Sequence, residues 1–307
     1  MDKKVKLKVI TLCSGIGCQE RGIENTGLFD LEIVATSEID KYAVLSYAAI
    51  HHGLTNKTVF SFTDYPSLDE MKQYLTDINI GYIPEKDKKF NWFQNGEKFN
   101  QDVKKYWLAC KLSNNLGDIS RIERLPEADL WTISTPCSDI SVAGKLKGLN
   151  PDDKTRSSLI WQNIRLLKEA KDNHALPKYI LLENVKNLVG KKFIKDFETF
   201  NELVESFGYN TYYKVLNACE CGVPQNRERV FAIYIRKDID SGKFTFPIPF
   251  DNGLRLKDVL EEEVDEKYYI NTKKAEDLIQ KLIDDGTLED PEKKIIYLDE
   301  DITEEQV

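Results

Sequence analysis

The sequence predicts an α/β domain built on a doubly wound, mostly parallel sheet, with an insertion between two of its strands. Residues 1–52 alternate apolar, strand-like runs with segments of helical spacing, and this alternation returns after about residue 130. The chain has 307 residues, of which 41% are hydrophobic. It is therefore long and apolar enough to bury a sizeable core.

The amino-terminal part contains the first two strand–helix units. The apolar run at residues 5–13 predicts a buried strand, and residues 14–17 predict a turn into a helix that ends near Asn25. Residues 31–37 predict the second strand, and residues 41–52 have helical spacing. Because parallel strands are joined by crossover helices, this order is typical of the opening of a doubly wound sheet.

The later elements follow the same pattern. The expected strands are residues 130–134, 179–182, 215–216 and 230–235, and the expected helices are residues 157–170 and 193–207. Residues 61–114 interrupt the pattern, since they are polar, aromatic and lysine-containing. We interpret this segment as an insertion on the sheet and expect residues 1–250 to form one domain.

Charge and hydropathy limit the class of protein. Residues 251–307 contain 19 acidic and 8 basic residues, and the whole chain has a net charge of −9, which leaves +2 for residues 1–250. Charge alone therefore neither proposes nor excludes DNA as a partner. No stretch approaches the ~20 apolar residues of a membrane helix. The first apolar run is too short for a signal peptide, so we expect a cytoplasmic protein.

The cysteines do not form a metal-binding or disulfide pattern. The chain has six, at positions 13, 18, 110, 137, 219 and 221, and only three histidines. A zinc site needs about four ligands at workable spacing, so the sequence predicts no metal site. We expect reduced thiols, most of them packed as small apolar groups and one or two of them functional.

Two features of the first strand–helix units favour an adenosine-type cofactor. Residues 13–17 form a glycine turn that opens a helix, where a ligand could approach the backbone and free N–H groups. Glu38 follows the second strand, where nucleotide-binding sheets place a carboxylate for ribose hydroxyls. The alternatives are an ordinary structural turn and a helix-capping acid.

Candidate catalytic residues follow three later strands. Cys137 lies in a loop just past a strand, where ligands bind in open α/β sheets, although a buried structural cysteine is the alternative. Glu183 caps another predicted strand and could share the same cleft. Arg227 and Arg229 would face the same side of an extended chain, unless they form a surface ion pair with Glu228.

Over roughly residues 5–240 the chain resembles the cytosine-5 DNA methyltransferases in ordered motifs. The matching segments are residues 11–17, 117–119, 135–137 with Ser141, Gly144, Lys145 and Gly148, 155–157 with Leu159, 183–185, and 225–229. The resemblance implies the Rossmann-like sheet of S-adenosylmethionine-dependent methyltransferases. It also implies S-adenosylmethionine as cofactor and a cytosine of double-stranded DNA as substrate.

The resemblance further implies the roles of individual residues. The expected catalytic residues are Cys137, the nucleophile, with Glu183, Arg227 and Arg229. The expected cofactor contacts are Cys13, Ser14, Gly15, Ile16, Gly17, Glu38, Ile39, Asp118, Ile119, Pro136 and Leu159. The expected DNA contacts are Ser138, Ser141, Lys145, Lys147 and Arg156. Residues 138–151 would form a mobile loop that closes over the flipped base, although its lysines could also be merely solvated.

The chain also departs from the family pattern. The family usually has Asp and Phe where Thr11 and Cys13 stand, and Gln where Ser138 stands. Residues 251–307 resemble only the start of a target-recognition region, and the closing motifs of the family do not follow before Val307. We therefore expect either a second chain that carries the missing part or a truncated product. The alternatives are a tRNA cytosine methyltransferase and an inactive cofactor- or DNA-binding remnant. The sequence does not decide whether the biological role is self-protection, restriction partnership or phage defence evasion.

Overall fold

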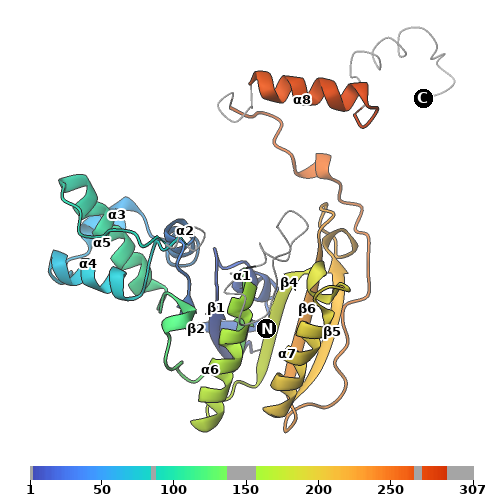
Figure 1. Ribbon diagram of the computed structural model, residues 1–307. Helices are drawn as coiled ribbons and strands as arrows, with labels where there is room; N and C mark the ends of the chain where they lie inside the picture. The colour runs from blue at the N-terminus through green and yellow to red at the C-terminus, as the bar shows by residue number, and fades with distance from the viewer. Residues whose placement is uncertain (1–2, 84–87, 137–156, 266–271, 289–307) are drawn as a thin grey trace. The chain divides into compact units, whose positions relative to one another are not determined.

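The computed structural model describes residues 3–83, 88–136, 157–265 and 272–288 (Figure 1). The loop of residues 137–156, which includes Cys137, lies outside the described residues. The chain divides into two compact units, residues 1–254 and residues 255–307. Each unit is described by itself.

The first unit is built on a six-stranded sheet in the order β2-β1-β3-β4-β6-β5. The strands are β1 (Val5–Leu12), β2 (Phe29–Ser37), β3 (Leu130–Ile133), β4 (Tyr179–Val185), β5 (Tyr209–Asn217) and β6 (Glu228–Arg236). The pairings of β1 with β2, β1 with β3 and β3 with β4 are parallel, whereas β6 runs antiparallel to both β4 and β5. This arrangement confirms the doubly wound, mostly parallel sheet that the sequence predicts, and it is Rossmann-like.

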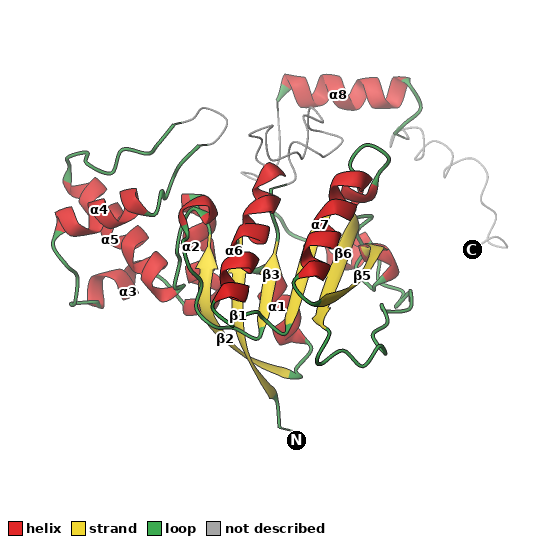
Figure 2. Ribbon diagram, turned by 60° about the horizontal axis from the view of Figure 1, so that its bottom comes forward, coloured by secondary structure: helices red, strands yellow, loops and turns green. Residues whose placement is uncertain are grey.

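Helices cover both faces of this sheet. They are α1 (Cys18–Asn25), α2 (Lys41–His52), α6 (Ile160–Asp172) and α7 (Ile194–Ser206). Figures 1 and 2 show α6 and α7 on one face and α1 on the other. The bounds of α2 agree with the prediction because residues that favour helix ends, Asp40 and Gly53, flank it. The Asp40 side chain accepts hydrogen bonds from two backbone N–H groups of the first turn, and Gly53 ends the helix at φ 64°.

The main core lies between the sheet and the α6–α7 pair. All four residues of β3 are buried, as expected for a central strand covered on both faces. Aromatic side chains of α7, Phe197 and Phe200, are fully buried against this sheet, and Phe200 makes an edge contact with Tyr234 of β6. At roughly 25 cal/mol per Å² of apolar area, such rings are large contributors to stability.

Four strands, β2, β4, β5 and β6, are longer than predicted, and the extensions of β4 and β5 are the informative ones. β4 continues through Val185 because residues 183–185 pair with residues 229–231 of β6. Glu183 therefore lies within the strand and not after it. β5 starts at Tyr209, well before the predicted run, because its whole length pairs antiparallel with β6 at the edge of the sheet. An edge strand tolerates polar residues, so its hydrophobic pattern is weak.

The insertion between β2 and β3 forms a small helical layer with its own core. Its helices are α3 (Asn56–Ser61), α4 (Leu68–Asp77) and α5 (Glu97–Leu112). Met71, Leu75 and Trp92 are almost completely buried there, and Val44 and Ala48 of α2 belong to the same cluster. The insertion thus packs on α2 and extends the sheet layer beyond β2 (Figure 2).

The second unit contains little described structure. It has a short 3₁₀ turn at Leu256–Val259 and the helix α8 (Lys273–Asp284), which begins with Thr272 as its N-cap. The interpretation of residues 251–307 as the start of a target-recognition region stays a prediction. Among the described residues, no helix combines the length and the apolar character that crossing a bilayer requires.

Candidate active site

The predicted site residues gather at one edge of the sheet. Residues 13–17 follow β1, Glu38 follows β2 and Pro136 follows β3, while Glu183 lies near the end of β4. The parallel register aligns these ends, since Leu12 lies opposite Ile133 and Ile133 opposite Leu182. In open α/β sheets the carboxyl ends of the strands are where ligands bind.

The loop after β1 has the backbone conformation that its glycines require. Cys13, Gly15 and Gly17 all have positive φ angles, of 57°, 55° and 82°. A side chain at Gly17 would collide with the rings of His51 and Tyr47, so only glycine fits there. A Cβ at Gly15, in contrast, would meet nothing within 4 Å. The loop therefore leaves open space above Gly15 for a ligand.

Glu38 holds this loop against the end of β2. Its Oε2 accepts a hydrogen bond from the backbone N–H of Gly15 (2.9 Å), and its Oε1 accepts from the N–H groups of Ile39 and Asp40 (both 2.8 Å). Burial raises the pKa of the Glu38 carboxyl, although these backbone hydrogen bonds oppose the shift. The carboxylate is fixed in one orientation, and Oε2 keeps a lone pair free for a ligand hydroxyl.

Asn115 brings Asp118 to the same edge, across the long insertion. Its Oδ1 accepts from the N–H groups of Glu38 (3.0 Å) and Gly117 (2.9 Å), and its Nδ2 donates to the Glu38 carbonyl (3.0 Å). Asp118 is held by Ser120, whose N–H and hydroxyl donate to Oδ1, and by Asn79, whose amide donates to Oδ2. Sequence reasoning identifies Asp118 but misses Asn115.

Cys13 lies close enough to Glu38 and Asp118 for both negative charges to affect its thiol pKa. Burial, followed by the charges of these two carboxylates, raises the pKa of the Cys13 thiol well above its usual range. Cys13 is therefore a neutral thiol and is unsuited to be a nucleophile. The five described cysteines, which are Cys13, Cys18, Cys110, Cys219 and Cys221, are all free thiols.

Replacing Gly117 with alanine is expected to destabilise the fold by more than about 2 kcal/mol. Gly117 has φ 76°, and an added Cβ would collide with the carbonyl oxygen of Ile78. Gly27→Ala is the matched control, because Gly27 has φ 69° but open space around it. The control should lose only the ~1 kcal/mol of left-handed backbone strain. Equal losses for the two variants in urea unfolding would show that the close approach at Gly117 is unimportant.

The residues that flank the loop of residues 137–156 are well fixed. The Ser157 hydroxyl donates to the Pro136 carbonyl (3.1 Å), which closes the base of the loop. The Asn184 amide donates to the backbone carbonyl (3.3 Å) and hydroxyl (3.4 Å) of Thr135. Asn184 is buried, so these bonds anchor the chain two residues before Cys137. The strand that carries Glu183 and the chain that leads to Cys137 are thereby tied to one another.

The predicted loop contacts themselves lie outside the described residues. These are Cys137, Ser138, Ser141, Lys145, Lys147 and Arg156. Their roles stay predictions.

Glu183 and Arg229 form the central ion pair of the site. The Arg229 Nε lies 3.2 Å from the Glu183 Oε1. The Glu183 side chain is 24% exposed and the Arg229 side chain 22%. Val185 lies opposite Arg229 in the β4–β6 register, which makes Glu183 the diagonal neighbour of Arg229. Burial raises the pKa of Glu183, although the positive charges of Arg229 and Arg227 oppose it. A carboxyl group with a raised pKa can serve as a proton donor near neutral pH.

Glu228 does not compete for these arginines. It pairs instead with Lys186, with 2.7 Å between Oε1 and Nζ. The alternative of a surface ion pair with the Glu228 side chain is therefore wrong for Arg229. Its guanidinium pairs with Glu183 and donates to the backbone carbonyl of Glu228, not to the Glu228 carboxylate. The backbone of Arg227 is held by Asn217, whose Oδ1 accepts from the Arg227 N–H (2.9 Å). Its charge still acts on Glu183.

The remaining predicted cofactor residues differ in accessibility. Ile16 is 45% exposed at the open side of the loop, whereas Ile119 is 3% exposed and belongs to the main core. Ile39 is half-buried, and its carbonyl accepts from the Gly81 N–H of the insertion (2.7 Å). Leu159 is half-buried and packs against the core. Within the described part of the chain, no group of three or more potential ligand side chains could hold a metal ion.

Comparison with known proteins identifies the class to which this fold and site belong. The sequence profile of the C-5 cytosine-specific DNA methylases matches residues 7–84 and 78–301. The chain therefore belongs to this family, which is a family of enzymes, the DNA (cytosine-5-)-methyltransferases. The match includes both the strand-end motifs and most of the second unit.

Particular relatives cover most of the chain. The type II methyltransferase M2.ScrFI of Lactococcus lactis subsp. cremoris is 41% identical over 278 residues, which are 88% of this chain and 72% of the relative. The orphan methyltransferase M.SssI of Spiroplasma monobiae is 32% identical, over 88% of this chain and 69% of its own length. Among solved structures, an Entamoeba histolytica methyltransferase matches 88% of this chain and 63% of its own, with 17% identity and a TM-score of 0.49. Part of each of these proteins thus lies outside the match.

Proposed function

We propose that this chain transfers a methyl group from S-adenosylmethionine to carbon-5 of a cytosine in double-stranded DNA, through a covalent bond to Cys137. The observation that best supports this proposal is the Glu183–Arg229 pair, because Glu183 lies on β4, the neighbour of the strand after which the Cys137 loop begins. Family membership supports the reaction type. Carbon-5 of cytosine is a weak nucleophile, so an enzyme has to activate the ring.

The loop after β1 and the end of β2 fit the proposed cofactor. The open space above Gly15 gives room for a ligand, and the fixed Glu38 carboxylate offers an acceptor for ribose hydroxyls. Glu38 and Asp118 also make this edge negative, which suits a cationic sulfonium. When bound, S-adenosylmethionine would supply the electrophilic methyl group.

Cys137 would activate the cytosine. Its thiolate would add to carbon-6 of the flipped base and break the π bond between carbon-5 and carbon-6, which removes the aromaticity of the ring and places electron density on carbon-5. After methylation, loss of the carbon-5 proton would expel the Cys137 thiolate and restore the ring. The contacts of Thr135 with Asn184 hold the chain on which this loop begins.

Glu183 would stabilise the charge that this addition creates. A protonated carboxyl can donate to the ring N3 and, through its other oxygen, accept from the exocyclic amine. The raised pKa of Glu183 keeps the protonated form accessible. Arg229 would orient Glu183 and donate to the O2 of the base, and Arg227 would contribute positive charge at the opening of the site.

Replacing Glu38 with alanine is expected to weaken S-adenosylmethionine binding by about 10- to 100-fold, which corresponds to the ~1.5–3 kcal/mol of a hydrogen bond to a charged group. Glu32→Ala is the control, since Glu32 is an exposed carboxylate of the same strand, β2. Isothermal titration calorimetry would measure both. Equal affinity for the two variants would show that Glu38 does not bind the ribose.

Transfer of a radioactive methyl group tests the proposed activity directly. The purified chain is incubated with labelled S-adenosylmethionine and with duplex DNA, with DNA lacking cytosine, or with tRNA. Label in cytosine-containing DNA alone is expected. Label in tRNA would instead favour a tRNA methyltransferase. Incorporation by the purified chain would also exclude the alternative in which a second chain carrying a recognition domain is needed.

A further inference from the structure

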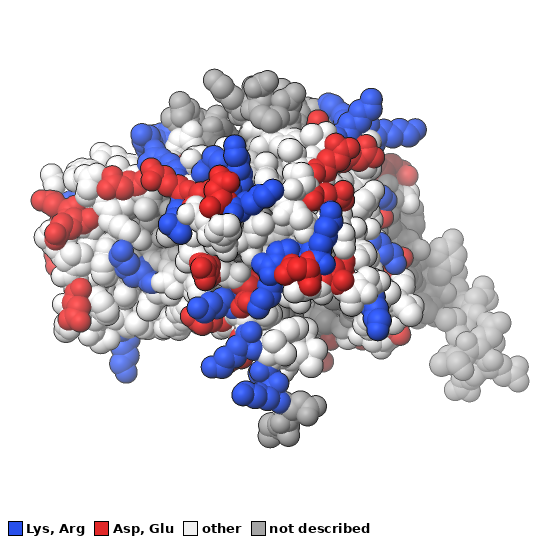
Figure 3. All heavy atoms as spheres, turned by 90° about the horizontal axis from the view of Figure 1, so that it is seen from below, with Lys and Arg blue, Asp and Glu red and all other residues white. Residues whose placement is uncertain are grey.

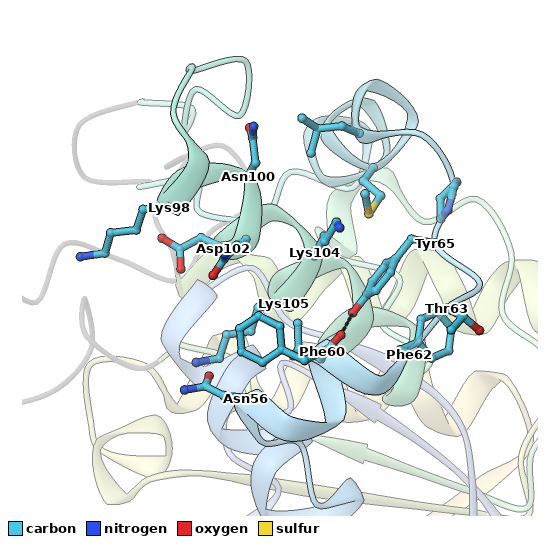
Figure 4. Close-up of a pocket in the computed structure, with 15 residues that line it drawn as sticks. Asn56, Phe60, Phe62, Thr63, Tyr65, Lys98, Asn100, Asp102, Lys104 and Lys105 are labelled. Atoms are coloured by element: carbon cyan, nitrogen blue, oxygen red, sulfur yellow. Dashed lines mark hydrogen bonds between the residues drawn. The ribbon is translucent and has the colours of Figure 1, made fainter.

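A groove lies in the helical insertion, and none of its lining residues belongs to the strand-end site. Its cavity volume is about 870 Å³, within the range of ligand sites in proteins. One wall is the face of α5 that carries Lys98, Gln101 and Lys105, and α3 contributes Asn56 and Phe60. Figure 4 shows how side chains from α3, α5 and the connecting loop surround the groove.

The groove has a net positive charge, and its lysines are not paired with carboxylates of the described residues. Lys98, Lys104 and Lys105 line it together with a single acidic residue, Asp102. Among the described residues, none of the three ammonium groups is within ion-pair or hydrogen-bond reach of a carboxylate. Three like charges in one groove repel each other, so an anion that entered would be stabilised.

A second hollow of the first unit has basic side chains that are paired with carboxylates. On the face in Figure 3, blue and red side chains are interspersed. A smaller hollow, of about 410 Å³, contains Lys178 and Arg236, but Lys178 pairs with Asp129 (2.8 Å) and Arg236 with Asp238 (2.6 Å). The groove in the insertion differs from this hollow, because none of its three lysines has a carboxylate partner among the described residues.

Aromatic side chains complete the groove. Phe60 is 72% exposed, which is unusual for so large an apolar ring. Tyr65 is half-buried, its hydroxyl donates to the Val59 carbonyl (2.9 Å), and the Lys104 Nζ lies 5.3 Å from its ring centroid. Lysines that contact phosphates, next to aromatic rings that pack on sugars or bases, are typical of nucleic-acid-binding surfaces.

We propose that this groove binds the phosphate backbone of the DNA substrate outside the target base pair. The inference rests on the proposed DNA substrate and assigns a second contact surface to it. Lys98, Lys104 and Lys105 would contact phosphate oxygens, and Phe60 would pack on the deoxyribose next to them. Contacts of this kind give affinity and register without reading sequence.

The insertion connects this groove to the active-site edge through α5. The chain leaving α5 forms a bridge from Asn115 to Thr36 of β2, and Asn115 also holds Glu38. With a rise of ~1.5 Å per helical residue, Lys105 and Lys98 lie about 10 and 21 Å along α5 from Leu112. At ~3.4 Å per base pair, the groove would reach phosphates roughly three to six base pairs from that edge.

The test compares the salt dependence of DNA binding by the wild-type chain and two triple variants. Lys98→Gln/Lys104→Gln/Lys105→Gln removes the charge of the groove. Lys168→Gln/Lys191→Gln/Lys195→Gln is the control, since it removes three exposed lysines of the sheet helices and their connections. Fluorescence anisotropy with a labelled duplex, over a series of salt concentrations, gives the dissociation constant of each protein.

The groove variant is expected to bind DNA more weakly, to a similar degree for duplexes of different sequence. The slope of log affinity against log salt should fall in magnitude by about 1 for each lysine that contacts a phosphate, while the control keeps the wild-type slope. Phe60→Ala should also weaken binding, without a change in slope. If wild type and groove variant bind DNA with the same slope, the groove is not a DNA contact, although the proposed function stands. If none of the proteins binds DNA, the proposed function fails with it.

Discussion

Replacing Cys137 with serine is expected to lower the rate of methyl transfer by on the order of 10³-fold or more, while S-adenosylmethionine still binds. Serine is nearly isosteric, but its hydroxyl is far less ionised and less nucleophilic than a thiol, so addition to carbon-6 would fail. The strand-end residues proposed to hold the cofactor, including Glu38, do not depend on the sulfur. Single-turnover transfer of labelled methyl groups and calorimetric cofactor binding measure the two effects separately.

Cys219→Ser provides the matched control for this prediction. Cys219 is an exposed free thiol in the turn after β5 and is proposed to have no part in the reaction. This variant should retain wild-type turnover. Wild-type turnover by Cys137→Ser would rule out Cys137 as the nucleophile. Loss of cofactor binding in that variant would instead indicate a damaged site.

The second large effect is expected for Glu183→Gln, which should lower kcat by about 10²- to 10⁴-fold, the range typical of a lost general acid. Glutamine has almost the shape of glutamate and can still contact the base, but it cannot deliver a proton to N3. Glu228→Gln is the control, because Glu228 lies nearby on β6 but pairs with Lys186. A weak effect of Glu183→Gln, equal to that of the control, would contradict the role of Glu183.

The pH dependence of the wild-type chain should report the same group. Burial raises the pKa of Glu183, and the protonated carboxyl is the proposed donor. kcat/KM is therefore expected to fall as pH increases through this raised pKa, in addition to any limb from ionisation of the Cys137 thiol. Arg229→Gln removes a positive charge that opposes the shift, so the limb due to Glu183 should move to higher pH. A limb that did not move would mean that another group titrates.

The parts of the site that the sequence predicts are those that follow from strand position. Periodicity locates the ends of β1, β2 and β3, and parallel strands must end at one edge, so the sequence alone suffices to place residues 13–17 and Glu38 together. The family motifs add Asp118, although some eighty positions separate it from Glu38. The core of the sheet follows from the same apolar runs.

The side-chain hydrogen bonds that hold these parts together cannot be predicted from the local sequence. Asn115 lies in a loop after α5, and nothing in its neighbours indicates that its amide bridges Glu38 and Gly117. Asn184 is visible in the sequence only as part of a motif, and its contacts with Thr135 depend on the β3–β4 register. Hydrogen bonds between residues far apart in sequence are set by tertiary packing, which periodicity does not encode.

The pairing of Glu183 also depends on tertiary structure. From the sequence alone, the two arginines could equally pair with Glu228. The antiparallel β4–β6 register decides between these partners, because it places Arg229 diagonally across from Glu183 and leaves Glu228 to Lys186. Similarly, the helix α5 (residues 97–112) is not predicted from the sequence. Its buried face is recognised only from the second core, which α5 shares with α2 and α4.

The most direct test of the central claim is covalent capture of the chain on DNA. The purified chain is mixed with S-adenosylmethionine and duplex DNA in which 5-fluorocytosine replaces cytosine. Fluorine at carbon-5 cannot leave as a proton does, so the Cys137 bond to carbon-6 should persist after methylation. A protein–DNA adduct that survives denaturation, and that is absent for Cys137→Ser, is the predicted result. An adduct of equal yield with Cys137→Ser would contradict the assignment of the nucleophile, and no adduct with the wild-type chain, under conditions in which it binds both DNA and cofactor, would contradict the covalent mechanism.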